Sequence, residues 1–529
     1  MFINLLKNTL TYKTLLTYRK IPICDSFMSD NDKFIDAIEA FIAKHGWTPT
    51  RFGREIAGDP LFVFDLRDGR EPRSETRNKI LKSMNDFSDN GKLTPLRIGV
   101  AGLGTVGAEL VRILAKDSVE ISRKIGRELI VSAVGARSRS RDRGIDLSNV
   151  KWFDDPVALA KSDDIDLFVE LIGGEDGPAL AAVKAALSIG KPVVTANKAL
   201  LAKHGVALAA IAEKAGAQLG FEAAVAGGIP VIKALREGLG SASVTRAYGI
   251  MNGTCNYILS RMGVEDISFE DCLKDAQTLG YAEADPTFDV GGFDTAHKLA
   301  ILASLCFATE IAPDEIFIEG ITAITQADIK VANDLGYKIK LLGLTQLSPE
   351  GIEQRVHPTL VPKTSAIAGV DGVLNAVMLE TDHVHELMLA GPGAGGAATA
   401  SSVLSDIFDI ARGTAVPPLG VPSNELAPYK RAPMRTHEGG YYIRFNAKDV
   451  PGTLGVITTS MGKQEISIQS IIQRPDLQVA GEAQDKENTR TIILITQKTM
   501  ESNIRKALGE IAKSGMVIGE AQLIRIEKF

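Results

Sequence analysis

The chain has 529 residues, of which 45% are hydrophobic and 23% are charged. This length predicts roughly two to four domains, and the composition is typical of an ordinary α/β protein. The formal net charge of −6 argues against a role for the whole chain on a nucleic acid or a membrane surface, although one basic module is compatible with it. No apolar run approaches the roughly 20 residues of a membrane-spanning helix.

Residues 1–28 form a leader with four basic and no acidic side chains before Asp25: Lys7, Lys13, Arg19 and Lys20. A transit peptide has this composition. The alternative, which we favour, is an upstream extension of the reading frame ahead of a start at Met28. The four cysteines lie far apart without a C-x-x-C pair, which argues against a metal cluster or a disulfide framework. We therefore expect a cytoplasmic protein.

Residues 29–93 predict a small helical module. "DKFIDAIEAFIAKHG" has helical periodicity, and the following segment is interrupted by Gly and Pro. The order of parts loosely resembles the helix-turn-helix module of bacterial regulators, with "FGREIAG" as the first paired helix. The arginines that punctuate the segment are more often a solvated face, so DNA binding is not favoured.

Residues 94–230 predict a Rossmann domain that binds NAD(P). A short strand, a glycine loop and an amphipathic helix follow one another in "LRIGVAGLGTVGAELVRIL". In a G-x-G-x-x-G loop the glycines permit the tight turn, the approach of a pyrophosphate and the packing of helix on strand. Strands and helices alternate afterwards, as in a doubly wound sheet. The loop residues expected at the coenzyme are Gly102, Leu103, Gly104, Thr105, Val106 and Gly107.

The end of the second strand indicates which coenzyme is bound. Arg137 and Arg139 stand in "VGARSRSRDR", and no acid occurs before Asp142. An acid at this place holds the ribose hydroxyls of NAD, whereas an arginine suits the 2′-phosphate of NADP. We expect NADP(H) to be preferred and NAD(H) to remain possible. Alternatively, these arginines only solvate a loop.

A second cluster of charges precedes a long apolar helix in "LGYAEADPTFDVGGFDTAHKLAILASLCFA". Asp294 is expected as the helix N-cap, and Lys298 follows one turn later on the same face. An exposed ion pair would be the simplest explanation. However, "KLAILASLCFA" is apolar nearly all round, so the charged turn is expected to face a cleft, where a positioned ammonium has a chemical use.

At this point the sequence closely resembles homoserine dehydrogenase. The resemblance rests on the glycine loop and on "TANK", "FEAAVAGGIP", "NGTCNYIL", "LGYAEADPTFDVGGFDTAHK" and "GPGAGGAATASSVLSD", from residue 97 to about 412. It implies reduction of L-aspartate 4-semialdehyde to L-homoserine, in the pathway to threonine, methionine and isoleucine. It also implies a catalytic and dimerisation domain at 231–425, with 391–412 returning to the nucleotide domain, and a homodimer or homotetramer.

The resemblance also assigns roles to individual residues. It makes Lys298 the acid/base lysine, Asp294 its partner and a substrate ligand, Glu283 a ligand of the substrate and Asp289 a less certain neighbour. Lys198 matches the active-site lysine that reaches substrate and nicotinamide. The further residues implied are Gly280 and Gly395 at the coenzyme, and a monovalent cation (Na⁺ or K⁺) on Glu222 and the carbonyls of Val225, Gly227 and Ile229.

Residues 440–529 resemble an ACT domain, with the expected order βαββαβ. "DVPGTLG" matches the strand-to-helix loop at which that family binds amino acids. An effector, with L-threonine as the candidate, is therefore expected at Pro451, Gly452 and Thr453. The alternative is a purely structural dimerisation module.

The expected fold class is thus α/β: a Rossmann domain, an α+β catalytic domain, an ACT-like domain and a helical N-terminal module. Two other functions stay open. An NAD(P)-sensing DNA-binding regulator would need only the nucleotide site and not the catalytic lysines and carboxylates. A dehydrogenase that oxidises a semialdehyde would need a nucleophilic cysteine, for which Cys255 is the candidate near a motif, although it lacks a neighbouring histidine.

Overall fold

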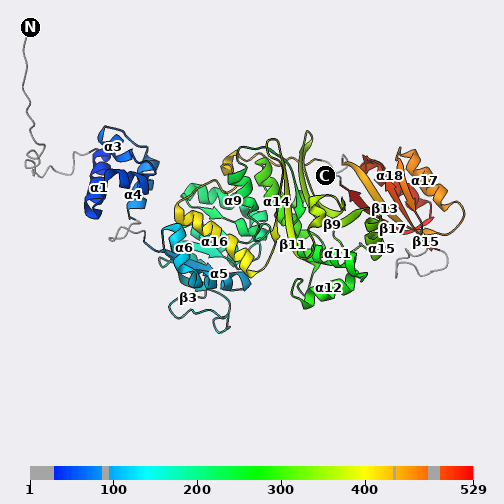
Figure 1. The fold of residues 1–529 in the computed structure, drawn as a ribbon, viewed down its shortest axis with the longest axis horizontal. Coiled ribbons are helices and arrows are strands. Elements are labelled where there is room, and N and C mark those ends of the chain that lie inside the picture. The colour runs from blue at the N-terminus through cyan, green and yellow to red at the C-terminus, as the bar shows by residue number, and fades with distance from the viewer. Residues whose placement is uncertain (1–28, 86–93, 433–436, 475–488, 528–529) are drawn as a thin grey trace, which may run out of the picture. The chain divides into compact units, whose positions relative to one another are not determined.

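The computed structural model describes residues 29–85, 94–432, 437–474 and 489–527. The chain separates into two compact units, residues 1–94 and 95–529, which are described one at a time (Figure 1). Within the described residues, no helix is both long and apolar enough to cross a membrane.

The first unit is helical. Ser29 and Asp32 cap the first helix reciprocally, and Gly46 ends it in the left-handed conformation. Apolar side chains such as Phe34, Ile38 and Phe52 form its core. Its elements are α1 (Asp30–His45), α2 (Pro49–Phe52), η1 (Gly53–Ala57), α3 (Phe62–Arg67) and α4 (Ser74–Asn85).

The second unit begins with a parallel six-stranded sheet in the order β3-β2-β1-β4-β5-β6. The strands are β1 (Leu96–Ala101), β2 (Leu129–Gly135), β3 (Lys151–Phe153), β4 (Leu167–Glu170), β5 (Val193–Thr195) and β6 (Leu219–Gly220). The associated helices are α5 (Thr105–Lys116), α6 (Ser118–Ile125), α7 (Pro156–Lys161), α8 (Pro178–Ser188) and α9 (Lys198–Ala215). This is the order of a Rossmann sheet, in which ligands bind at the carboxyl ends of the strands.

A distant segment completes this part of the unit. α16 (Gly396–Arg412) packs against α5, and its Val403 and Ile407 join the same apolar core as Leu110. The start of α16 also lies against the glycine loop, because a Cβ on Gly396 would lie 3.1 Å from Thr105 Cγ2.

The second sheet has 11 strands, whose main path is β12-β11-β7-β9-β10-β17-β13-β15-β14. Its strands are β7 (Val244–Ile250), β8 (Phe317–Ile318), β9 (Tyr337–Ser348), β10 (Gly351–Pro362), β11 (Leu374–Thr381), β12 (His385–Pro392), β13 (Glu438–Lys448), β14 (Ile468–Ile472), β15 (Thr489–Thr496), β16 (Thr499–Met500) and β17 (Val517–Ile526).

Helices connect the strands of this sheet between β7 and β12 and pack against them. α14 is buried from Asp294 to Ser304 except at His297, which is half-buried, and it packs on α9, β7, β9 and β10. The elements in this region are η2 (Glu222–Ala224), α10 (Val231–Lys233), η3 (Ala234–Gly238), α11 (Gly253–Glu265), α12 (Phe269–Thr278), α13 (Thr287–Val290), α14 (Phe293–Phe307), η4 (Pro313–Glu315), α15 (Gln326–Asp334), η5 (Ala366–Gly369) and η6 (Ser423–Glu425).

The C-terminal part, orange to red in Figure 1, follows the order β13-α17-β14-β15-α18-β17, with the short β16 before α18. Its helices are α17 (Thr453–Lys463) and α18 (Glu501–Lys513). The two helices cover one face, around Ile443 and Leu494, whereas Tyr442 and Ile524 on the other face join the apolar core of α14, β9 and β10, referred to below as the catalytic part. β17 pairs in parallel with β10 through Thr359↔Arg525 and Leu360↔Ile526, so one sheet runs through both parts.

Candidate active site

Two lysines and one aspartate meet at the centre of the site. Asp294 accepts hydrogen bonds from Lys298 Nζ at 2.7 Å and forms an ion pair with Lys198 Nζ at 2.9 Å. Lys198 is the first residue of α9, directly after the Asn197 cap at the carboxyl end of β5. Its side chain is 35% exposed, whereas that of Lys298 is 10% exposed, so Lys198 is the more accessible ammonium.

The expected N-cap role of Asp294 is wrong. The cap of α14 is Gly292, at φ 89°, and Asp294 is the second residue of the helix. Its carboxylate therefore lies one step inside the helix and is free to hold both ammonium groups. Two positive charges around one negative charge leave this triad with a net charge of +1.

Asn252 organises the carboxylates of the site. Its Nδ2 donates to Asp289 Oδ1 at 2.7 Å and to Asp294 Oδ2 at 2.9 Å. The preceding carbonyl, that of Met251, accepts from Lys298 Nζ at 2.6 Å. Both residues directly follow β7, so this strand sets the position of the triad.

The environment changes the pKa of each member. Burial opposes ionisation of Asp294, but the charges of Lys298 and Lys198 outweigh it and hold its pKa well below the usual range. Burial lowers the pKa of Lys298, and Asp294 offsets this only in part. For Lys198 the attraction of Asp294 outweighs burial and raises the pKa. Burial and the charge of Asp294 raise the pKa of Asp289.

The predicted substrate ligand Glu283 lies at the exposed edge of this cluster. Its charge contributes to the raised pKa of Lys198, so the carboxylate lies within electrostatic range of this ammonium. Gly280, in the turn after α12, has φ 75° and no atom within 4 Å of an added Cβ. Phe288 stacks on Phe293 with ring centroids 6.3 Å apart, and both rings are exposed.

The glycine loop has the features required for a dinucleotide. Gly102 has φ 99°, and a Cβ there would lie 2.2 Å from the carbonyl oxygen of Leu171. A Cβ on Gly107 would lie 2.0 Å from the Gly102 oxygen, whereas space beside Gly104 is open. Gly104 and Gly395 are the N-caps of α5 and α16, and neither has a side-chain cap. The adjoining helix starts therefore offer backbone amides to phosphates.

The arginine loop after β2 folds back on the glycine loop. Arg143, a residue that sequence reasoning did not single out, donates to the carbonyl of Leu103 at 3.0 Å and to that of Ser138 at 2.6 Å. Arg137 is exposed at the end of β2. Asp142 is engaged in the loop itself, accepting from the Gly144 amide at 2.9 Å.

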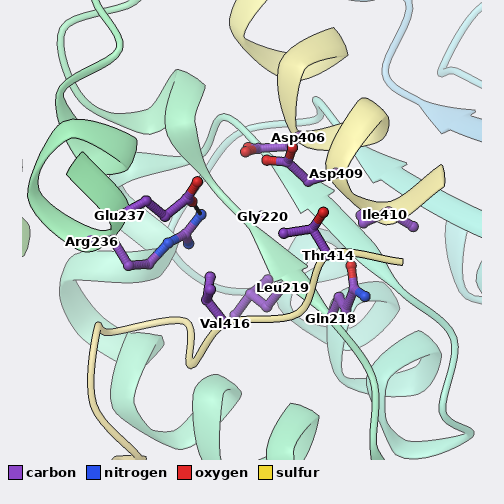
Figure 2. A pocket seen from close by; sticks show the side chains of 10 residues that line it. All are labelled: Gln218, Leu219, Gly220, Arg236, Glu237, Asp406, Asp409, Ile410, Thr414 and Val416. Atoms are coloured by element: carbon purple, nitrogen blue, oxygen red, sulfur yellow. Dashed lines mark hydrogen bonds and ion pairs between the residues drawn. The ribbon is translucent and has the colours of Figure 1, made fainter. Parts of the chain in front are cut away.

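Glu222 belongs to a second buried cluster, apart from the lysine triad. Its carboxylate accepts the amides of Ile232 at 2.9 Å and Lys233 at 2.8 Å, while its own amide donates to Asp406 at 2.8 Å. Burial and the charge of Asp406 raise the pKa of Glu222 to about 7. Figure 2 shows Asp406 and Asp409 on α16 beside a small cavity of 30 Å³ next to Gly220.

The other residues predicted to ligate a cation lie in the loop that follows. Gly227 has φ 56°, and a Cβ there would lie 2.3 Å from the Gly393 oxygen, so glycine is required where this loop meets the segment before α16. No group of three or more His, Cys, Asp or Glu side chains suited to a metal occurs in the described part of the chain. A cation here would depend on main-chain carbonyls such as those of Val225, Gly227 and Ile229.

Two further predicted sites are the effector turn at the start of α17 and the thiol of Cys255. Pro451 and Gly452 are exposed at the start of α17, and Thr453 is buried. Gly452 has φ 96° and open space around it. Cys255 is fully buried, its Sγ donates to the Asp289 carbonyl at 3.2 Å, and burial raises its pKa well above the ordinary value. A buried thiol of this kind is a poor nucleophile.

Sequence reasoning missed the residues that position the others. Asn252 stands in a quoted motif and had a detectable signal, since it is also the cap of α11. Glu170, fully buried at the end of β4, accepts from Thr195 Oγ1 at 2.6 Å and from the Ile172 amide at 2.7 Å. A buried acid at the carboxyl end of a predicted strand would have pointed to it.

Comparisons with known proteins identify the family of this chain. Residues 102–222 match the family described as "Homoserine dehydrogenase, NAD binding domain", and residues 230–408 match "Homoserine dehydrogenase". A homoserine dehydrogenase of Neisseria gonorrhoeae is 43% identical over 441 residues, covering 82% of this chain and 99% of the relative. One of Pseudomonas aeruginosa is 42% identical over 444 residues, covering 82% and 100%.

Solved structures with a similar fold are also homoserine dehydrogenases. The crystal structure of a homoserine dehydrogenase from Thiobacillus denitrificans has a TM-score of 0.75 at 41% identity and covers 82% of this chain and 98% of its own. A hyperthermophilic archaeal homoserine dehydrogenase in complex with NADPH has a TM-score of 0.51 at 28% identity, covering 60% and 97%. This chain belongs to the homoserine dehydrogenase family of oxidoreductases.

Proposed function

We propose that this protein reduces L-aspartate 4-semialdehyde to L-homoserine and prefers NADPH as coenzyme. The observation that carries the proposal is the pairing of Lys198, which follows the carboxyl end of β5, and of Lys298 with the same carboxylate of Asp294. The test is consumption of NADPH with L-aspartate 4-semialdehyde in phosphate-free buffer, with detection of L-homoserine. Absence of both would contradict the proposal.

A bound nicotinamide coenzyme would supply the hydride. As the aldehyde carbon accepts it, negative charge develops on the oxygen, and a positioned ammonium stabilises this transition state more than the ground state. In the proposal the accessible Lys198 lies against the oxygen and the nicotinamide. Lys298 protonates the oxygen directly or through a water that it orders. Glu283 holds the α-amino group of the substrate, with Asp289 beside it.

The preference for NADPH is supported by the loop after β2. Arg137 is exposed where a 2′-phosphate is expected, and the nearest acid, Asp142, is used inside the loop. The bracing of this loop by Arg143 holds it beside Leu103. We also propose NADH as a weaker alternative coenzyme.

A monovalent cation is the second proposed cofactor. The buried carboxylate of Glu222, whose pKa is raised to about 7, would gain a compensating positive charge from it. In the proposal Glu222 and the carbonyls of Val225, Gly227 and Ile229 hold Na⁺ or K⁺. Hard, oxygen-rich ligands suit such an ion.

Regulation and assembly are further parts of the proposal. The turn from Pro451 to Thr453 is proposed to bind an amino-acid effector such as L-threonine through the amides at the start of α17. Loss of threonine inhibition in Gly452→Asp, with unchanged turnover, would support this site, and inhibition that persists would argue against it.

The edge strand β12 is a candidate contact for a homodimer or homotetramer. We propose a cytoplasmic location.

Neither alternative function is favoured by a specific observation. The helical module from 29 to 85 contains ten basic and ten acidic side chains. Arg67 pairs with Glu39 at 2.8 Å and Arg70 with Asp65 at 2.8 Å, and the equal numbers of acidic and basic side chains leave the module without the net positive charge that DNA binding favours. An aldehyde-oxidising mechanism would need a reactive thiolate, and Cys255 is buried.

A further inference from the structure

A cavity lies where the C-terminal part joins the catalytic part of the second unit. It has a volume of 210 Å³ and is lined by residues that include Tyr337, Glu438, Gln469, Thr496, Lys498 and Glu527. These residues come from the ends of β9, β13, β14, β15 and β17. This volume is enough for several water molecules, and therefore for a small ligand. We refer to it as the seam cavity.

Two opposite charges stand at its mouth. Lys498 Nζ lies 2.8 Å from Glu438 Oε2, and the two side chains are 69% and 50% exposed. An exposed pair of this kind contributes little to stability, so a ligand can separate it at little cost. A molecule with one carboxylate and one ammonium would pair with Lys498 and Glu438 at the same time.

The interior of the seam cavity offers polar groups to such a ligand. Thr496 is 2% exposed, and its Oγ1 accepts from the Tyr441 amide at 3.0 Å, which leaves the hydroxyl hydrogen available to donate. Gln469 adds an exposed amide at the rim. A Cβ on Gly439 would lie 3.0 Å from His437 Nε2, so glycine keeps this wall free of a side chain.

Behind that wall, His437 is buried, and its Nδ1 accepts from Arg355. Burial and the charge of Arg355 lower the pKa of His437 to about 2, so the ring is neutral and its proton is on Nε2. Among the described residues this Nε2 has no hydrogen-bond partner. The carboxylate oxygen Oε1 of Glu527, a residue that lines the cavity, lies 3.9 Å from this nitrogen, beyond hydrogen-bond distance.

We propose that the seam cavity binds a small zwitterionic amino acid, with its carboxylate on Lys498 and its ammonium on Glu438, at a site separate from the Pro451–Thr453 turn. The size, the paired opposite charges at the mouth and the polar interior all fit this chemical class. A singly charged molecule of the same size would leave Lys498 or Glu438 without a partner.

The floor of the seam cavity connects it to the catalytic triad. Glu527 is held by Arg355 at 2.7 Å and by Arg246 at 2.8 Å. Arg246 stands on β7, the strand that ends directly before Met251 and Asn252. A ligand that shifts Glu527 therefore acts on the strand that positions Lys298 and Asp294. This effect on turnover rests on the proposed function, whereas binding to the cavity does not.

Binding is measured by isothermal titration calorimetry on the full-length Gly452→Asp variant. In that variant the turn is closed, because any side chain at φ 96° strains it and the added charge repels a carboxylate. The probes are L-threonine, L-serine and L-methionine, with butyrate and propylamine as singly charged analogues. We expect at least one amino acid to bind and neither analogue to do so.

Adding Lys498→Ala or Glu438→Gln to that background should weaken binding about 10- to 100-fold, because each removes a charge-assisted hydrogen bond. Lys513→Ala, an exposed lysine of α18, serves as the matched control and should leave binding unchanged. Absence of binding by all three amino acids would overturn the proposal. So would binding that survives both charge variants, since the ligand would then lie elsewhere.

The coupling is tested on turnover with the amino acid that binds. Arg246→Gln should keep the affinity and remove most of the effect of the ligand on kcat, because the link from Glu527 to β7 is then lost. An undiminished effect would refute the coupling through Arg246. If the protein shows no dehydrogenase activity at all, the proposed function fails, while calorimetry still decides whether the seam cavity binds an amino acid.

Discussion

Replacement of Asp294 by asparagine should lower both the stability and the catalytic activity of the enzyme, because several groups depend on this one carboxylate. Asp294 is 4% exposed and holds Lys298 at 2.7 Å, Lys198 at 2.9 Å and the amide of Asn252 at 2.9 Å. Asparagine keeps the volume, so no cavity forms, but it leaves the buried ammonium of Lys298 and the partly exposed ammonium of Lys198 without their shared counter-charge. Removing one partner of a buried ion pair typically costs about 3–5 kcal/mol of unfolding free energy.

The same substitution should change the catalytic pH profile. Asp294 raises the pKa of Lys298 and so partly offsets the lowering by burial. Without that charge the pKa falls further. Since the ammonium form exists below the pKa, protonated Lys298 would be lost at a lower pH than in the wild type. The alkaline limb of kcat/KM for aldehyde reduction should therefore move to lower pH.

For an acid/base group that loses its correct protonation state, the expected loss in kcat/KM is about 10²–10⁴, or roughly 3–5 kcal/mol. Two measurements test this. NADPH oxidation is followed from about pH 6 to about pH 10, which lies just below the ordinary pKa of lysine. Stability is measured by denaturant unfolding. Asp285→Asn is the matched control, because Asp285 is exposed and its carboxylate accepts a hydrogen bond from the Thr287 amide in its own turn. Turnover within about tenfold of the wild type, with an unmoved alkaline limb, would refute the reasoning.

Four other outcomes are expected. Lys298→Ala should lower kcat about 10²–10⁴-fold while thermal unfolding stays cooperative, and near-normal turnover would remove this lysine from the mechanism. Arg137→Ala should raise the KM for NADPH and leave that for NADH nearly unchanged, and equal effects on both would mean that the arginine does not contact the 2′-phosphate. Deletion of residues 1–93 should leave reductase activity largely intact, because the second compact unit begins at Pro95, and a folded but inactive truncation would contradict this. Replacing Na⁺ and K⁺ by tetramethylammonium should lower activity reversibly, whereas Glu222→Gln should lose that dependence; equal activity in all salts would argue against the cation.

The sequence by itself determined the local elements and the chemical groups. The glycine loop is encoded by three glycines at fixed spacing after an apolar run, and the structure has φ 99° at Gly102 as that turn demands. Lys198, Asp294 and Lys298 could be named because each stands in a short motif. The type of each element follows from hydrophobic periodicity, which depends only on near neighbours. The position of Asp294 within its helix did not follow, since Gly292 replaces it as the cap.

The tertiary structure alone decided which of these groups meet. Lys198 reaches Asp294 because α9 packs against α14, and the bridge from Asn252 to Asp289 and Asp294 depends on where β7 ends. Arg246 and Glu527 are separated by 281 residues and pair because β17 joins β10 in the shared sheet. Strand register and the packing of distant surfaces set such contacts, and no local pattern in the sequence specifies them. For this reason the chemistry of the active site could be predicted, whereas its positioning residues and the seam cavity could not.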